Sequence, residues 1–177
     1  MKKLVLLTGA TGGIGQAIAK QLAKEGYRLL LQGRNRQKLL ALQATVGDEH
    51  EVIVADLCDE QSRTDMLDML NRRGDLSIVI NNAGISSFTR FEQESAENIN
   101  WLMAINLIIP MQICQSLLSQ IKQNKGAIIN IGSAFGYIGF PCFSSYCASK
   151  FGLRGFSESL SRELANTDVS IGYFAPR

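Results

Sequence analysis

The chain has 177 residues, of which 46% are hydrophobic, and its formal net charge at pH 7 is +2. This length predicts a single domain over residues 1–177, large enough to bury a hydrophobic core. The small net charge and the lack of a long basic run argue against nucleic acid as the main partner.

Strands and helices alternate along the whole sequence. In chain order the pattern predicts a strand at 3–7, a glycine-rich turn at 9–15 leading into a helix, a strand at 28–32, a helix at 36–46, a strand at 51–55, a helix at 59–70, a strand at 77–80, a helical region at 96–122, a strand at 127–131, a helix at 144–165 and a strand at 169–174. Asp59 is a suitable N-cap, and Pro110 is expected to kink the long helical region.

The predicted strands are short and continuously apolar, as strands are when helices cover both faces of their sheet. Regular alternation of strands and helices favours a parallel arrangement of those strands. The expected fold class is therefore α/β, with six parallel strands between two layers of helices.

The cysteines and the short apolar run at the N-terminus exclude several classes of protein. The four cysteines form no Cys-x-x-Cys pair and the chain has one histidine, His50, in a polar turn where we expect it to be solvated, so neither a metal site nor a disulfide framework is expected. Scattered thiols favour the reducing cytoplasm. The apolar run after Lys3 breaks at Thr8-Gly9, which is too early for a signal peptide. No apolar stretch approaches transmembrane length, so no membrane association is expected.

The glycine-rich stretch Thr8 to Gly15 lies between a predicted strand and a predicted helix. In that position glycines let the backbone approach a pyrophosphate, while the amides at the start of the helix face its negative charge. Because a strand precedes the glycines and a helix follows them, the stretch indicates a dinucleotide site more strongly than the glycine pattern alone would. The alternative is a tight turn whose glycines serve packing only.

The ends of the next three strands carry polar or small residues. Gly33 takes the place where an acidic residue would bind the ribose hydroxyls of NAD, and Arg34 follows it, which favours the 2′-phosphate of NADP(H) over NAD(H). The alternative is a solvated Arg34 that opens a basic helix. Asp56 fits either the adenine amino group or a helix cap. Asn81 is at least as suited to tying neighbouring strands as to binding a ligand.

Tyr146 and Lys150 stand four residues apart, on one face of a predicted helix, and Ser133 precedes them. A free tyrosine titrates at about 10, and a nearby ammonium stabilises its phenolate. Hydride addition to a ketone builds negative charge on oxygen, and the hydroxyls of Ser133 and Tyr146 are suitable donors to it. Taken singly, each residue also has a structural explanation: a turn serine, a solvated lysine.

Four motifs in register resemble the small, single-domain branch of the short-chain dehydrogenase/reductase family. They are Thr8-Gly9-x-x-x-Gly13-Ile14-Gly15, Asn81-Asn82-Ala83-Gly84, Ser133, and Tyr146-Cys147-Ala148-Ser149-Lys150. The resemblance covers the whole chain. It implies a Rossmann-type doubly wound sheet and an oxidoreductase that transfers a hydride between nicotinamide and a carbonyl or secondary alcohol, with NADP(H) preferred.

The resemblance also implies residue roles. Tyr146 would be the catalytic acid or base, Lys150 would lower its pKa and hold the nicotinamide ribose, and Ser133 would bind the substrate carbonyl. Asn106 would support a water-linked proton relay. The remaining cofactor residues would be Gly9, Thr11, Gly13, Ile14, Gly15, Arg34, Asp56, Leu57, Asn82 and Gly84.

The sequence departs from the family pattern at its end. It stops at Ala175-Pro176-Arg177, just after the last predicted strand, where family members continue with a substrate loop, a helix and a seventh strand. A fragment of a longer chain is favoured over a truly short protein, and cofactor binding is expected to survive the shortening better than turnover.

Partners and competing functions follow from the remaining residues. The surplus of isoleucines at 105–113 favours a homo-oligomer, most simply a homodimer. A small carbonyl or alcohol compound is the expected substrate, with no nucleic-acid or membrane partner. Two other functions compete: a cofactor-binding sensor or scaffold without turnover, and a nucleotide-sugar epimerase or dehydratase that uses the nucleotide transiently.

Overall fold

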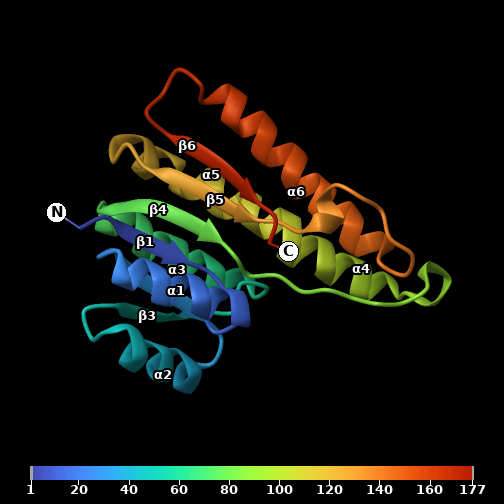
Figure 1. Ribbon diagram of the computed structural model, residues 1–177, viewed down its shortest axis with the longest axis horizontal. Coiled ribbons are helices and arrows are strands. Elements are labelled where there is room, and N and C mark those ends of the chain that lie inside the picture. The colour runs from blue at the N-terminus through green and yellow to red at the C-terminus, as the bar shows by residue number, and fades with distance from the viewer. Residues whose placement is uncertain (1, 177) are drawn as a thin grey trace.

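A single parallel sheet forms the centre of the computed structural model, which describes residues 2–176 (Figure 1). Its strands are β1 (Leu4–Leu7), β2 (Arg28–Gly33), β3 (Glu51–Val54), β4 (Leu76–Asn81), β5 (Ala127–Ile131) and β6 (Ser170–Phe174). They are ordered β3-β2-β1-β4-β5-β6, and each neighbouring pair is parallel. The first half of the chain adds β2 and β3 on one side of β1, and the second half adds β4, β5 and β6 on the other side. This order confirms the doubly wound α/β fold.

Helices cover the sheet in two outer layers. They are α1 (Gly13–Lys24), α2 (Arg36–Val46), α3 (Glu60–Arg73), α4 (Ala96–Met103), α5 (Ile109–Gln123) and α6 (Ser144–Glu163). Figure 1 shows α1 and α2 together on one face, while α3, α5 and α6 lie on the other. The winding direction reverses between β1 and β4, and in open α/β sheets the crevice at that reversal, outside the carboxyl ends of the strands, is where ligands bind.

The hydrophobic core has two halves, one on each face of the sheet. Alternate residues of β1 supply both: Leu4 and Leu6 pack with α3 and α5, whereas Val5 and Leu7 pack with α1 and α2. All four side chains are at most 2% exposed. Burial on both faces explains why the strands read as continuous apolar runs instead of alternating ones.

The long helical region is not one kinked α-helix. It consists of α4, a π-helical turn at Ala104–Ile108, and α5. The backbone stays helical through Ile108 and Ile109, so Pro110 lies inside a continuous helix, and the N–H that it lacks leaves a carbonyl of the π turn without that partner. The irregularity is therefore in the turn that precedes the proline. Asn106, a predicted catalytic residue, lies within this π turn, and such turns are frequent at functional sites.

Two sequence expectations were wrong. The segment Ala96–Gln123 has the length and mean hydropathy of a membrane-spanning helix, although no apolar stretch was expected to approach that length. Its Ile109, Ile113 and Leu117 are buried against the sheet, so burial in the core of this domain accounts for the apolar composition. His50 is 2% exposed and not solvated, because its Nδ1 accepts the N–H of Leu29 at 3.3 Å.

Candidate cofactor and catalytic site

Thr8 joins the loops that follow β1 and β4. Its hydroxyl oxygen accepts the backbone N–H groups of Asn82 and Ala83, each at 3.0 Å. In return, the Asn82 carboxamide donates to the carbonyls of Thr8 and Gly9 at 2.9 and 3.0 Å. These bonds fix the glycine-rich loop against the Asn-Asn-Ala-Gly loop at the carboxyl edge of the sheet.

The glycines of this loop have distinct structural reasons. Gly9 has φ of +61°, and a Cβ there would lie 2.8 Å from Cα of Ala83. A Cβ on Gly15 would lie 2.4 Å from the carbonyl oxygen of Gly9, so only glycine lets α1 start this close to the loop. A Cβ on Gly13, in contrast, would meet nothing within 4 Å. Packing therefore explains Gly9 and Gly15 and leaves Gly13 unexplained.

A cavity of about 540 Å³ opens over the carboxyl ends of the central strands. Its lining includes every cofactor residue predicted from the sequence except Tyr146 and Lys150: Gly9, Thr11, Gly13, Ile14, Gly15, Arg34, Asp56, Leu57, Asn82 and Gly84. The predicted cofactor residues of four separate loops thus meet at one cavity. Among residues 2–176, no group of His, Cys, Asp or Glu side chains is arranged to hold a metal ion.

Sequence reasoning missed several residues that line or support this cavity. Trp101 and Ile105 line it from α4 and the π turn, and their i, i+4 spacing just before Asn106 was an available signal. Gln32 is 2% exposed, and its side chain accepts the N–H of Gly9 at 3.1 Å and donates to the carbonyl of Ala55 at 2.8 Å. The signal for this supporting role was available in the sequence, because Gln32 is a lone polar residue in an otherwise apolar strand.

Arg34 and Asp56 stand at the mouth of the cavity on neighbouring strand ends. The Arg34 Nη1 and the Asp56 Oδ2 are 4.0 Å apart, and both side chains are largely exposed. Asp56 does not cap α3, because Asp59 does so by accepting the N–H of Ser62 at 2.7 Å. The Asp56 carboxylate accepts the N–H of Cys58 at 3.0 Å instead. Both charged groups therefore remain accessible to a ligand.

Asn81, left open between two roles, is a structural residue. Its side-chain nitrogen donates to the Asn130 Oδ1 at 2.8 Å, and Asn130 in turn donates to the Ser157 hydroxyl at 2.8 Å. Asn81 and Asn130 are each at most 2% exposed and sit side by side on β4 and β5. The chain of amides ties β4 and β5 to α6, as the strand-tying alternative expected.

Lys150 is 5% exposed, and its ammonium donates to the carbonyl of Ile131 at 3.1 Å. The Lys150 nitrogen lies 5.8 Å from the ring centroid of the half-buried Tyr146. Burial lowers the pKa of Lys150 to about 8. A Cβ on Gly84 would lie 3.6 Å from this nitrogen and 3.0 Å from the Asn106 Oδ1. Lys150 and Asn106 therefore lie next to Gly84, which lines the cavity.

Ser133 follows β5 and opens a short 3₁₀ turn at Ala134–Gly136, in which its hydroxyl oxygen accepts the N–H of Phe135 at 3.2 Å. The turn role considered for this serine therefore exists, but it uses only the acceptor side of the hydroxyl. The hydroxyl proton is still available to donate to a bound oxygen.

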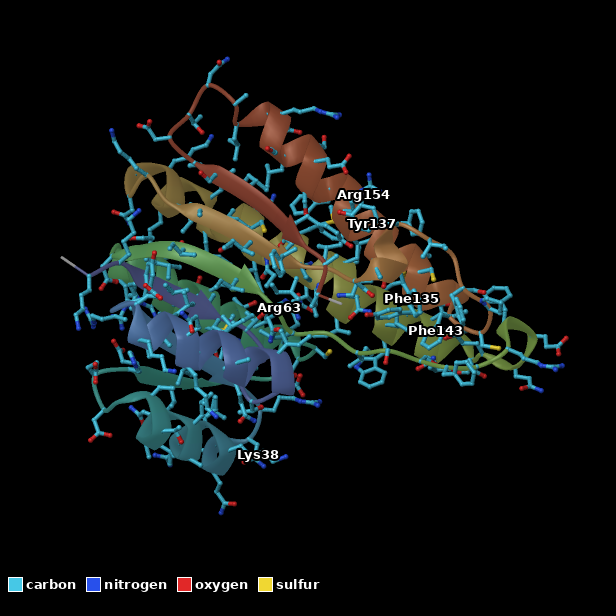
Figure 2. All side chains as sticks on the ribbon, viewed as in Figure 1. Lys38, Arg63, Phe135, Tyr137, Phe143 and Arg154 are labelled. Atoms are coloured by element: carbon cyan, nitrogen blue, oxygen red, sulfur yellow. The ribbon has the colours of Figure 1, made fainter. Side chains whose placement is uncertain are left out.

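Aromatic rings surround Tyr146 on the side of the β5–α6 connection. Phe135 and Phe143, which Figure 2 shows together, have ring centroids 4.9 Å apart, and their centroids lie 6.2 and 6.1 Å from that of Tyr146. Phe140 stacks on Phe135 at 5.4 Å, and Phe88 reaches Phe143 at 5.2 Å from the loop after β4. The Tyr146 ring thus borders an apolar, aromatic surface.

Comparison with known proteins places this site in a family. A family model described as short chain dehydrogenase matches residues 3–177. The chain is 35% identical over 176 residues to a 3-oxoacyl-[acyl-carrier-protein] reductase of Haemophilus influenzae, covering 98% of the chain and 73% of that protein. It is also 35% identical over 178 residues to carbonyl reductase family member 4 of Xenopus tropicalis, covering 99% and 75%.

The fold comparison agrees. The crystal structure of a metagenomic short-chain oxidoreductase in complex with NADP superposes with a TM-score of 0.92 at 30% identity, covering 99% of this chain and 81% of that one. The matched region contains the glycine-rich loop, the Asn-Asn-Ala-Gly loop and the Tyr146–Lys150 helix described above. The chain belongs to the short-chain dehydrogenase/reductase family, oxidoreductases that act on CH–OH and C=O groups.

Proposed function

We propose that the chain is an NADP(H)-dependent carbonyl reductase that also runs in reverse as a secondary alcohol dehydrogenase. One observation carries the proposal: a glycine-lined cavity at the sheet's reversal point ends beside a buried Lys150 that adjoins the Tyr146 ring. The first half of that arrangement suits a dinucleotide and the second half suits proton exchange with a carbonyl oxygen.

The residues around the cavity fit a nicotinamide dinucleotide. Gly13 has no packing reason to be glycine, and a side chain there would project into open space where a pyrophosphate would approach the start of α1. Arg34 would hold the 2′-phosphate of NADP(H), since its side chain is exposed and its ion-pair partner Asp56 is as far as 4.0 Å away. The NADP-bound relative supports this choice of cofactor. When bound, NADPH would supply the hydride.

The chain's own residues would manage the proton. Tyr146 would donate its phenolic proton to the carbonyl oxygen during reduction, and Ser133 would donate a second hydrogen bond to the same oxygen. The Lys150 ammonium would favour the resulting phenolate by its charge. Asn106 is proposed to support the water-linked return of a proton.

The aromatic surface around Tyr146 supports a substrate with an apolar or aromatic group beside its carbonyl. Phe140 and Phe88 are 52% and 72% exposed although each contacts another aromatic ring. Exposed aromatic rings beside a catalytic hydroxyl are typical of a pocket for a flat or apolar ligand.

The proposal extends to assembly and location. Ile108 and Met111 on the π turn and α5, and Phe151 on α6, are 45%, 38% and 43% exposed, and we propose that they pair two copies of the chain. All four cysteines are free, which supports a cytoplasmic location.

Trp101, the single tryptophan of the chain, lines the cavity, so its emission should report cofactor binding without a label. Titration with NADPH should quench its emission and excite NADPH emission by energy transfer. Oxidation of NADPH should then follow at 340 nm with a panel of aryl and alkyl ketones. The proposal predicts saturable binding and a ketone-dependent rate that Tyr146→Phe abolishes while binding persists. Binding with no rate for any ketone would identify a sensor or scaffold instead.

A further inference from the structure

We propose that Tyr173 is a positioning residue whose hydroxyl clasps the Ser133 loop to the Lys150 turn of α6 and so sets the two proposed catalytic side chains in register. This inference rests on the proposed function. Tyr173 lies on β6, and neither the family motifs nor the cavity lining contains it.

The hydroxyl of Tyr173 reaches the backbone of both catalytic segments. Its oxygen accepts the N–H of Ser133 at 3.3 Å, and it lies 3.4 Å from the carbonyl oxygens of both Ser133 and Lys150. The single hydroxyl proton thus has two carbonyl acceptors from segments 17 residues apart in sequence. Burial raises the pKa of Tyr173, so this proton is retained at neutral pH.

Two glycines make room for this side chain. A Cβ on Gly132 would lie 2.0 Å from Cζ of Tyr173, and a Cβ on Gly136 would lie 2.0 Å from its hydroxyl oxygen. Neither glycine has a positive φ, so the backbone conformation does not require glycine at either position. At Gly132 the three nearest atoms to such a Cβ all belong to Tyr173, whereas at Gly136 the Lys150 carbonyl oxygen would also be 3.0 Å away.

A layered stack holds the Tyr173 ring on its outer side. Tyr137 meets it edge to face with centroids 5.9 Å apart, and the Arg154 guanidinium lies 4.2 Å from the Tyr137 centroid (Figure 2). Tyr137 belongs to the Ser133 loop and Arg154 to α6, so the stack joins the same two segments as the hydroxyl. Both contacts oppose separation of the loop from the helix.

The register of the two segments matters because Ser133 and Tyr146 must donate to one oxygen while Lys150 lies beside Tyr146. A displacement of about 1 Å in such a constellation lowers rates by up to about 10²-fold. If Tyr173 only filled space, its ring would be needed but its hydroxyl would not. The hydroxyl is therefore the group to test.

Tyr173→Phe keeps the ring and removes the clasp. We expect kcat for ketone reduction to fall about tenfold with the KM for NADPH changed less than about twofold. Amide hydrogen exchange in the segment 132–137 should rise at least about tenfold. Tyr27→Phe, the same chemical change remote from the site, should alter neither quantity.

The glycines supply an independent rescue test. Gly136→Ala should lower both kcat and the melting temperature, and Tyr173→Phe should partly restore the melting temperature of that variant. After loss of the hydroxyl oxygen at 2.0 Å, the atoms nearest to the new methyl would be the Lys150 carbonyl oxygen at 3.0 Å and Cζ of residue 173 at 3.2 Å, which is why the rescue is partial. Gly132→Ala should gain nothing from Tyr173→Phe, because its methyl would still meet Cζ at 2.0 Å.

Each outcome decides one claim. Wild-type kcat in Tyr173→Phe, or equal losses in kcat and NADPH affinity, would overturn positioning by the hydroxyl. Unchanged exchange in 132–137 would show that the clasp does not exist. A wild-type protein that reduces no ketone would overturn the proposed function, while the exchange measurement would still decide whether the clasp holds the loop.

Discussion

Asn106 and Ile85 bond to each other in both directions across the site. The Asn106 Oδ1 accepts the N–H of Ile85 at 2.9 Å, and its Nδ2 donates to the carbonyl of Ile85 at 2.8 Å and to the Ser149 hydroxyl at 3.1 Å. Asn106 is 0% exposed, so its amide has only these protein partners and no contact with solvent. The π turn thereby fixes the loop after β4 that lines the cavity.

We expect Asn106→Ala to lower the free energy of unfolding by about 2–4 kcal/mol, because it removes three hydrogen bonds at once, two to the half-buried backbone of Ile85 and one to the buried Ser149 hydroxyl. Asn98→Ala is the matched control: Asn98 donates to the Ser87 hydroxyl of the same loop at 3.0 Å but is only half buried, and its loss should cost less than about 1 kcal/mol. Urea unfolding of both variants measures the difference. Equal costs would contradict the bracing role of Asn106.

Lys150 should make stability depend on pH in a defined window. Burial lowers its pKa to about 8 in the folded state, from the ordinary lysine value of 10.5 that applies in the unfolded state. Below pH 8 both states hold the proton and the cost of burying the charge is present in full. Between about 8 and 10.5 the unfolded state binds more protons, so the free energy of unfolding rises with pH in that interval.

Replacing Lys150 by the uncharged, similarly long methionine removes this cost. Lys150→Met should be more stable than the wild type at pH 6–7 by up to about 3 kcal/mol, and the gain should vanish above about pH 10.5. Lys38→Met, at an exposed site on α2, should show no such difference. Melting curves between pH 6 and 11 test this, and a gain independent of pH would refute it. The variant should also lose ketone reduction.

Gly13 and Gly15 should separate ligand binding from packing. Gly15→Ala should destabilise the cofactor-free protein by about 2–3 kcal/mol, because its methyl would meet main-chain atoms of the preceding loop. Gly13→Ala should leave stability within about 1 kcal/mol of the wild type, since nothing lies within 4 Å of the new methyl.

The effect of Gly13→Ala should appear only when NADPH is present. Its methyl would stand in the cavity, so Gly13→Ala should shrink the rise in melting temperature that saturating NADPH produces in the wild type. Differential scanning fluorimetry with and without NADPH gives both readings for each variant. A full NADPH-induced shift in Gly13→Ala would remove the ligand-based explanation for this glycine.

Local sequence signals predicted most of the fold. The ends of α2 and β5 agree with the expected ranges, because capping residues and a change of hydrophobic period mark them. Helix α3 runs three residues beyond the expected end to Arg73, where Gly74 with φ of +75° ends it, a C-cap signal that the hydrophobic pattern alone does not weigh.

What the sequence did not predict depends on contacts between distant segments. The burial of His50 follows from a bond to Leu29, 21 residues earlier, and a polar turn gives no sign of it. The fit of Tyr173 against Gly132 and Gly136 spans about 40 residues, so those glycines read locally as ordinary turn residues. The π turn at Ala104–Ile108 has the composition of an ordinary apolar helix.

Arg34 should distinguish the two nicotinamide cofactors. Loss of a charge-assisted bond to the 2′-phosphate costs about 1.5–3 kcal/mol, so Arg34→Ala should weaken NADPH binding about 10- to 100-fold. NADH affinity should change less than about threefold. Arg36→Ala is the control. It removes a positive charge two residues further along the same basic segment and should affect the affinity for neither cofactor strongly. Trp101 emission measures the affinity of the wild type and of both variants for each cofactor, and equal weakening of both cofactors would leave Arg34 as a solvated residue before α2.

The exposed side chains of Ile108, Met111 and Phe151, here called the α5–α6 surface, should determine whether two copies of the chain form a dimer. Ile108 is 45% exposed at the start of this surface, and a carboxylate there would be buried without a partner if two copies paired through it. Ile108→Glu should therefore convert a dimer into a monomer in light scattering after gel filtration. Leu40→Glu makes the same change at a residue 42% exposed on α2, away from this surface, and should leave the dimer intact. A monomeric wild type, or dissociation by both variants alike, would exclude the α5–α6 surface as the interface.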